Sequence, residues 1–152
     1  MSKERPNWPQ LKLIGPLNAV GEFLKCPGVS HIPFVENHEL SAVMQQAKAI
    51  LLPSEIEGFG LPALEGYYHG TPVCFVQGTS VDEILSPFTA KGAFVLDDPQ
   101  SFKQALDDVL GMSFEEVVKV RDGLRARFSR DNFVEAVAAA LHDAGNAKGL
   151  PP

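Results

Sequence analysis

The sequence predicts an α/β domain, in which helices cover both faces of a parallel sheet. Short apolar runs bounded by Pro or Gly, typical of buried parallel strands, alternate along the chain with segments of helical periodicity. The length of 152 residues suits one domain with one well-buried core. We expect a flexible arm over residues 1–10, the domain over residues 11–143 and a tail over residues 144–152.

The elements follow from these local patterns in order. Strands are predicted at residues 11–15, 29–32, 49–53, 73–76 and 93–96. Helices are predicted at residues 39–48, 99–110, 114–128 and 131–143, and residues 18–25 are a further short candidate. The last helix should bury its apolar residues, which are Phe133, Val134, Val137 and Leu141. Strands alternating with helices in this way are typical of a Rossmann-like fold, whose ligands bind beyond the carboxyl ends of the strands.

Capping residues mark several helix starts. Asp98 precedes a proline, a pair that suits a helix N-cap and the first helical position. Ser113 with Glu116 has the spacing of a capping box, and so does Ser80 with Glu83. We therefore expect helices to begin directly after Asp98, Ser113 and Ser80.

The composition indicates a water-soluble globular protein and excludes several classes. Hydrophobic residues make up 45% and charged residues 21%, and the net charge is −6. No run of Lys and Arg exists that could form a nucleic-acid footprint. No apolar run approaches the ~18 residues of a membrane span, and the polar amino-terminus has no signal-peptide pattern. We expect a cytoplasmic protein.

Cysteine and histidine spacings do not predict a metal site. Cys26 and Cys74 form no disulfide framework, and Cys74 is interpreted as a small core residue. The histidines are scattered, without a Cys or carboxylate at ligand spacing. We therefore expect neither a metal nor a cofactor. The histidines are His31, His38, His69 and His142.

The most informative segment, residues 54–66, follows the strand predicted at 49–53. Gly58 and Gly60 allow a tight turn and close approach to a ligand, and Pro62 suits the first position of a helix. A glycine loop between a strand and a helix start points N–H groups and a positive dipole end at an anion. Glu57 and Glu65 flank this anion site, which favours a ligand with phosphates and several hydroxyls, such as a sugar nucleotide. On residue types alone, an ordinary strand-to-helix loop, in which Glu57 and Glu65 are solvated, explains the segment as well as a phosphate site does.

Residues 49–85 resemble the donor-binding, carboxy-terminal half of GT-B retaining glycosyltransferases of the family 4 type (glycosyl transferases group 1). The similarity runs without gaps through this block, and a weaker similarity extends from about Leu11 to Leu141. The motifs that carry the resemblance are Pro53-Ser54, Glu57 to Pro62, Glu65 and Gly70-Thr71-Pro72-Val73.

The resemblance implies a role for each part of the segment. Glu65 would hydrogen-bond the ribose hydroxyls, and Glu57 would lie beside the transferred sugar as the catalytic residue. The sugar and diphosphate would be held by the backbone N–H groups of Gly58, Phe59, Gly60 and Leu61. The implied reaction transfers a sugar from a nucleoside-diphosphate sugar to an acceptor with retention of configuration and without a metal.

The chain departs from the family pattern in three ways. The family carries an Arg and a Lys after its first strand, and no such pair exists here, so we expect the first strand to be missing. The acceptor-binding amino-terminal domain is also expected to be missing, and a separate chain or self-association could supply it. Pro33 stands where the family usually has Gly.

The sequence also permits functions other than sugar transfer. A non-catalytic remnant or nucleotide-binding module is the main alternative. A dinucleotide-dependent oxidoreductase is disfavoured, because residues 13–18 are not a Gly-x-Gly-x-x-Gly turn. A hydrolase is disfavoured because no His–Asp pair accompanies the candidate nucleophiles Ser54, Thr79 and Ser80.

The missing strand has a consequence for the sheet. In the order 3-2-1-4-5-6, the first strand pairs with the second and the fourth. We expect the strand at residues 11–15 to pair directly with the strand at 49–53. The alternative is that the amino-terminal arm or another chain fills the gap, since an open edge of a buried strand is costly.

Overall fold

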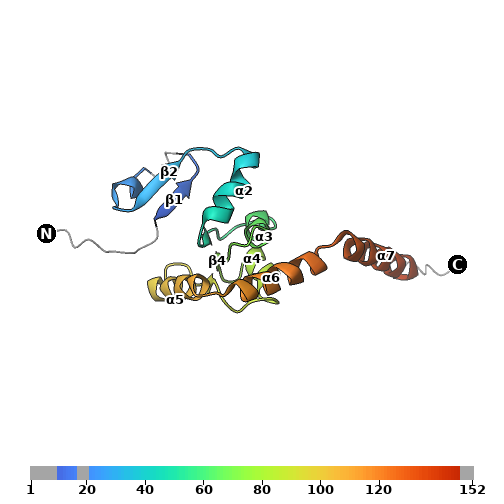
Figure 1. Cartoon of the computed structure of the whole chain (residues 1–152). Coiled ribbons are helices and arrows are strands. Elements are labelled where there is room, and N and C mark those ends of the chain that lie inside the picture. Colours follow the sequence, from blue (N-terminus) through green and yellow to red (C-terminus); the bar gives the residue numbers. More distant parts are fainter. Residues whose placement is uncertain (1–9, 17–20, 148–152) are drawn as a thin grey trace. The chain divides into compact units, whose positions relative to one another are not determined.

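The computed structural model describes residues 10–16 and 21–147 and divides the chain into two compact units (Figure 1). The amino-terminal unit is Met1–Lys48, and the carboxy-terminal unit is Ala49–Pro152. Most of the arm predicted over residues 1–10, and residues 148–152 of the predicted tail, lie outside the described residues. The single domain over residues 11–143 stays a prediction.

The amino-terminal unit contains a two-stranded parallel sheet. Strand β1 (Leu11–Ile14) pairs with β2 (Val29–Ile32), in a register that runs from Leu11↔Val29 to Ile14↔Ile32. The His31 Nε2 atom of β2 lies 2.6 Å from the Gly15 carbonyl oxygen, directly after β1, and this contact adds to the pairing of the two strands. Both predicted strands are confirmed.

Two predicted helices of this unit differ in the structure. Residues 17–20 are not described, and the rest of the candidate helix at 18–25 is a 3-10 turn, η1 (Phe23–Lys25). The chain turns back at Pro27-Gly28, where the Val29 N–H donates to the Cys26 carbonyl at 3.2 Å, so a longer helix has no room. Helix α2 (Asn37–Gln46) begins and ends two residues before the predicted bounds. It lies between Glu36 and Ala47, which both have extended backbone angles.

The carboxy-terminal unit is built on a three-stranded parallel sheet in the order β3-β4-β5. The strands are β3 (Ile50–Leu52), β4 (Val73–Val76) and β5 (Ala93–Phe94). All four residues of the central strand β4 are buried, as expected of an apolar run in a parallel sheet.

Helices cover both faces of this sheet, as predicted. Because successive side chains of a strand point to opposite faces, Val73 and Phe75 join one core cluster while Cys74 and Val76 join another. The first cluster contains residues of α3 (Leu61–Tyr68), α4 (Ser80–Leu85) and α6 (Phe114–Arg127). The second contains residues of α5 (Pro99–Leu110). The α/β fold class is therefore confirmed.

The caps decide where α4, α5 and α6 begin. Asp98 accepts hydrogen bonds from the backbone of Gln100 and Ser101, and Ser113 with Glu116 forms the predicted capping box. The capping box predicted for Ser80 is wrong, because the N-cap of α4 is Thr79. The reason lies in the preceding turn: the Gly78 N–H donates to the Asp82 carboxylate at 2.7 Å, which starts the helix one residue earlier.

The predicted direct pairing of the strand at 11–15 with the strand at 49–53 would join the two units and stays a prediction. Strand β1 pairs with β2, and β3 pairs with β4 in a register that begins at Ile50↔Val73. Within each unit, each strand pairs with the neighbour that its own crossover connection provides.

The final helix, α7 (Arg130–Ala147), is longer than predicted, and its apolar face is exposed. The expected burial of its four large apolar residues is wrong, since they are 41–69% exposed. Periodicity correctly indicated a helix with an apolar stripe, but nothing in the described part of the chain covers that stripe. These residues are Phe133, Val134, Val137 and Leu141.

Two buried groups make the fold sensitive to alkali. Burial raises the pKa of Tyr67 from 10.0 to about 12, and burial raises the pKa of Cys74 from 9.0 to about 12. The Tyr67 hydroxyl lies near the Val73 backbone but lacks the geometry of a hydrogen bond within the described residues. Both groups therefore favour folding only while they are protonated.

We expect the free energy of unfolding to fall as the pH rises above about 9, because a raised folded pKa gives stability that is lost at higher pH. The fall should reach about 1.4 kcal/mol per pH unit for each group. Urea denaturation between pH 8 and pH 11 measures it. The variant Tyr67→Phe should show a shallower decline above pH 10 than the half-buried control Tyr68→Phe, and equal declines would contradict the assignment.

Candidate functional site

The candidate site is the loop that connects the carboxyl end of β3 to the start of α3. Gly60 is the N-cap of α3 and has a φ of 79°, a conformation that favours glycine. A Cβ atom on Gly60 would lie 2.5 Å from the Val81 Cγ2 atom, so packing against α4 also requires glycine here. Pro62 lies at the second helical position, one residue later than predicted, where its missing N–H is equally harmless.

Four consecutive residues of this loop have free backbone N–H groups. Within the described residues, the N–H groups of Gly58, Phe59, Gly60 and Leu61 donate to no acceptor. The helix ladder starts only after them, where the Ala63 N–H donates to the Gly60 carbonyl at 2.9 Å. Free N–H groups beside the positive end of a helix form an anion site. The structure thus provides the unpaired donors that the glycine loop suggested.

The two carboxylates on either side of the loop are also available. Glu57 is half-buried in the loop, and Glu65 is exposed on α3, about one turn after its start. Neither carboxylate forms an ion pair or hydrogen bond within the described residues. An ionised carboxylate can accept two hydroxyl donors, so both side chains are free to bind a polyhydroxy ligand.

Three contacts support the loop from outside, and sequence reasoning missed all of them. The Ser80 hydroxyl donates to the Glu57 carbonyl oxygen at 3.0 Å, and Val81 closes around Gly60. The Phe59 ring meets the Phe128 ring edge to face, with 5.5 Å between the ring centroids. These partners come from α4 and from the end of α6, far along the sequence, and no local pattern signals such contacts.

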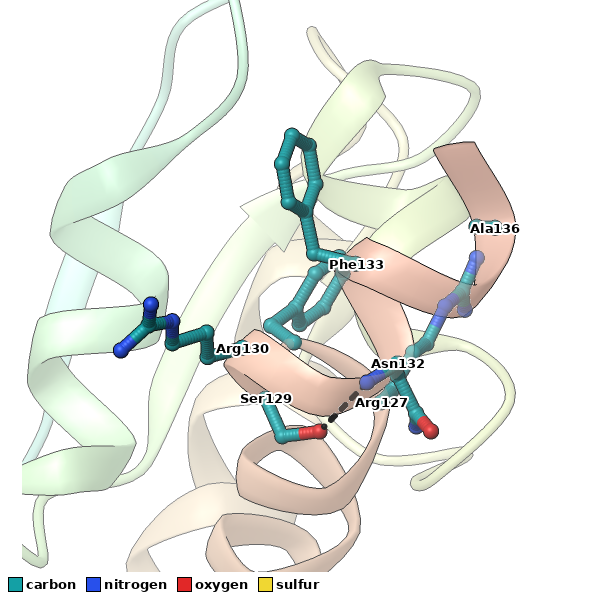
Figure 2. A pocket seen from close by; sticks show the side chains of 7 residues that line it. Arg127, Ser129, Arg130, Asn132, Phe133 and Ala136 are labelled. Atoms are coloured by element: carbon teal, nitrogen blue, oxygen red, sulfur yellow. Dashed lines mark hydrogen bonds between the residues drawn. The ribbon is translucent and has the colours of Figure 1, made fainter. Parts of the chain in front are cut away.

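An open hollow of about 530 Å³ lies at the junction of α6 and α7 (Figure 2). Its lining includes Phe128, but neither Glu57 nor Glu65. The Ser129 hydroxyl accepts a hydrogen bond from the Asn132 N–H at 3.2 Å, which caps the start of α7. The side chains of Arg130 and Phe133 leave that helix in different directions. The hollow is separate from the free N–H groups of the glycine loop.

In the part of the chain that the structure describes, no three His, Cys, Asp or Glu side chains come together as a metal site requires. None of the helices formed by the described residues has the length and apolar character of a membrane-spanning segment.

Comparison with known proteins assigns the family. The sequence profile of the glycosyl transferases group 1 family matches residues 24–130, which include the whole glycine loop and both carboxylates. The chain belongs to this family. The predicted resemblance is therefore confirmed at the level of the family, while the roles of individual residues stay predictions.

One curated protein is similar to this chain in sequence, and one solved structure is similar in fold. The chain is 32% identical over 87 residues to the MMP alpha-(1->4)-mannosyltransferase of Mycolicibacterium hassiacum, in a match that covers 57% of this chain and 20% of that protein. Its fold is similar to the crystal structure of WaaG, a glycosyltransferase involved in lipopolysaccharide biosynthesis, with a TM-score of 0.61 and 18% identity. That match covers 80% of this chain and 34% of WaaG, and it confirms the GT-B type of fold. The chain thus spans a fifth to a third of the length of these relatives.

Proposed function

We propose that this chain is the donor-binding half of a retaining glycosyltransferase that uses a nucleoside-diphosphate sugar. The observation that carries the proposal is a run of four N–H groups at Gly58–Leu61, flanked by the carboxylates of Glu57 and Glu65, all without a partner within the described residues. Family membership supports the sugar-transfer chemistry.

Each group in the loop has a task in this proposal. The N–H groups of residues 58–61 hold the sugar and diphosphate, and they stabilise the negative charge that develops on the leaving diphosphate. Glu65 accepts hydrogen bonds from the ribose hydroxyls, and Glu57 lies beside the transferred sugar. The acceptor attacks from the face that the diphosphate leaves, so the configuration at the sugar is retained. The backbone dipoles supply this stabilisation without a metal.

A nucleotide-binding module without transfer activity is the second candidate. It needs only the N–H groups of residues 58–61, which have no acceptor within the described residues, and no acceptor-binding surface. Both candidates bind a nucleoside diphosphate at the same loop. They differ in whether the chain, alone or with a partner polypeptide, transfers a sugar, and a transfer assay that depends on Glu57 separates them.

Thermal and chemical denaturation with nucleotides tests the proposed binding. We expect a nucleoside diphosphate at a hundredfold excess over its Kd to raise the free energy of unfolding by about 2.7 kcal/mol. UDP, GDP and ADP should be compared with the corresponding nucleosides, which lack the diphosphate and should give a smaller shift. If no nucleotide shifts the unfolding transition at millimolar concentration, the proposal is wrong.

A further inference from the structure

We infer that Ser80 is a positioning residue of the nucleotide site, because its hydroxyl sets the direction in which the Gly58 N–H points. This inference rests on the proposed function. Ser80 is the first residue of α4, and its hydroxyl donates to the Glu57 carbonyl oxygen at 3.0 Å across 23 residues of sequence. Helix α4 does not need this hydroxyl as a cap, because Thr79 already accepts from the Asp82 N–H.

The geometry of the peptide bond connects this contact to the ligand. The carbonyl of Glu57 and the N–H of Gly58 belong to the same planar trans peptide, so they point in opposite directions. When Ser80 holds the carbonyl toward α4, the Gly58 N–H must point away from α4. That N–H has no acceptor within the described residues, so it is available to a ligand.

Two further contacts hold other parts of the loop. Val81 packs against the α-carbon side of Gly60, and the Phe59 ring rests on Phe128. Without the Ser80 hydroxyl, the Glu57–Gly58 peptide loses its hydrogen bond to α4 and can rotate. A glycine on one side of a peptide makes such a rotation cheap. Loss of the hydroxyl should therefore affect ligand binding more than folding.

The test compares Kd values for UDP, GDP and ADP, measured by calorimetry in the whole chain. Ser80→Ala should weaken binding roughly two- to tenfold, the effect of one neutral hydrogen bond. Ser80→Thr keeps a hydroxyl and should restore the wild-type Kd. Ser86→Ala is the matched control, since Ser86 is exposed at the other end of α4 and should leave Kd unchanged.

A stability control separates positioning from folding. Val109→Ala removes buried volume in the core cluster on the α5 side of the sheet and should lower the unfolding midpoint without changing Kd. The inference is wrong if Ser80→Ala binds as tightly as the wild type. It is also wrong if Val109→Ala weakens binding as much as Ser80→Ala does.

A second readout does not depend on nucleotide binding. In ¹⁵N-labelled protein without ligand, Ser80→Ala should shift or broaden the Gly58 amide signal, whereas Ser80→Thr should leave it near its wild-type position. If the wild type binds no nucleotide but Gly58 responds in this way, the proposed function fails and the positioning of the peptide stands. An unchanged Gly58 signal in Ser80→Ala overturns the inference.

Discussion

Replacing Gly92 with alanine should lower the free energy of unfolding of the carboxy-terminal unit by about 2–5 kcal/mol. Gly92 is buried directly before β5 and has a φ of 97°, which costs a residue with a side chain about 1–2 kcal/mol. A Cβ atom there would lie 2.3 Å from the Val73 carbonyl oxygen and 3.1 Å from the Val109 Cγ1 atom. Since the first of these atoms belongs to the backbone of β4, it cannot move without disturbing the sheet.

Urea denaturation followed by far-UV circular dichroism measures this loss. Gly78→Ala is the matched control, because Gly78 has a φ of 77° but no atom within 4 Å of a built Cβ. That variant should lose only the backbone term of about 1–2 kcal/mol. If the two variants unfold at the same urea concentration, the close approach of Gly92 to β4 does not contribute to stability.

The sequence predicted the elements of the carboxy-terminal unit because their signals are local. The run Val73–Val76 is apolar at every position, and such a run is buried wherever a parallel sheet forms. Asp98 and Ser113 bind N–H groups two or three residues away, so their roles as caps can be read from spacing alone. Ser80 has the same spacing to Glu83, but the N-cap is Thr79, beside the turn that the Gly78–Asp82 hydrogen bond closes.

The sequence did not predict which helix faces and strand edges come into contact. Helical periodicity showed that Val137 and Leu141 share a face of α7, but periodicity does not reveal what covers that face. Likewise, the apolar pattern of β1 and β3 showed that both are strands without specifying their partners, which are β2 for β1 and β4 for β3. Such contacts depend on elements distant in sequence.

The candidate site contains both features that local sequence predicts and contacts that it does not predict. The glycines and carboxylates between Glu57 and Glu65 were visible in the sequence, because each residue type has a local chemical reason for its place. The free state of the N–H groups and the contacts from Ser80 and Phe128 became visible only in the fold. A loop motif can therefore be predicted from sequence more readily than the residues that hold it in shape.

Replacing Glu65 with alanine should weaken the binding of a nucleoside diphosphate by roughly ten- to 150-fold, without a comparable loss of stability. The carboxylate is exposed on α3 and has no partner within the described residues, so its removal leaves no buried group unsatisfied. Hydrogen bonds from two ribose hydroxyls to a carboxylate contribute about 1.5–3 kcal/mol to binding, which corresponds to this range of Kd. Glu83→Ala, at an exposed position of α4, is the control and should bind as the wild type does.

A ligand without ribose hydroxyls shows whether Glu65 has the proposed partner. A 2′,3′-dideoxynucleoside diphosphate cannot donate these hydrogen bonds, so it should bind the wild type more weakly than the ribonucleotide does. Glu65→Ala should then bind both nucleotides with similar Kd values, because the variant and the ligand each lack one side of the same interaction. If Glu65→Ala weakens the dideoxynucleotide as much as the ribonucleotide, the carboxylate acts on another part of the ligand and its ribose role is wrong.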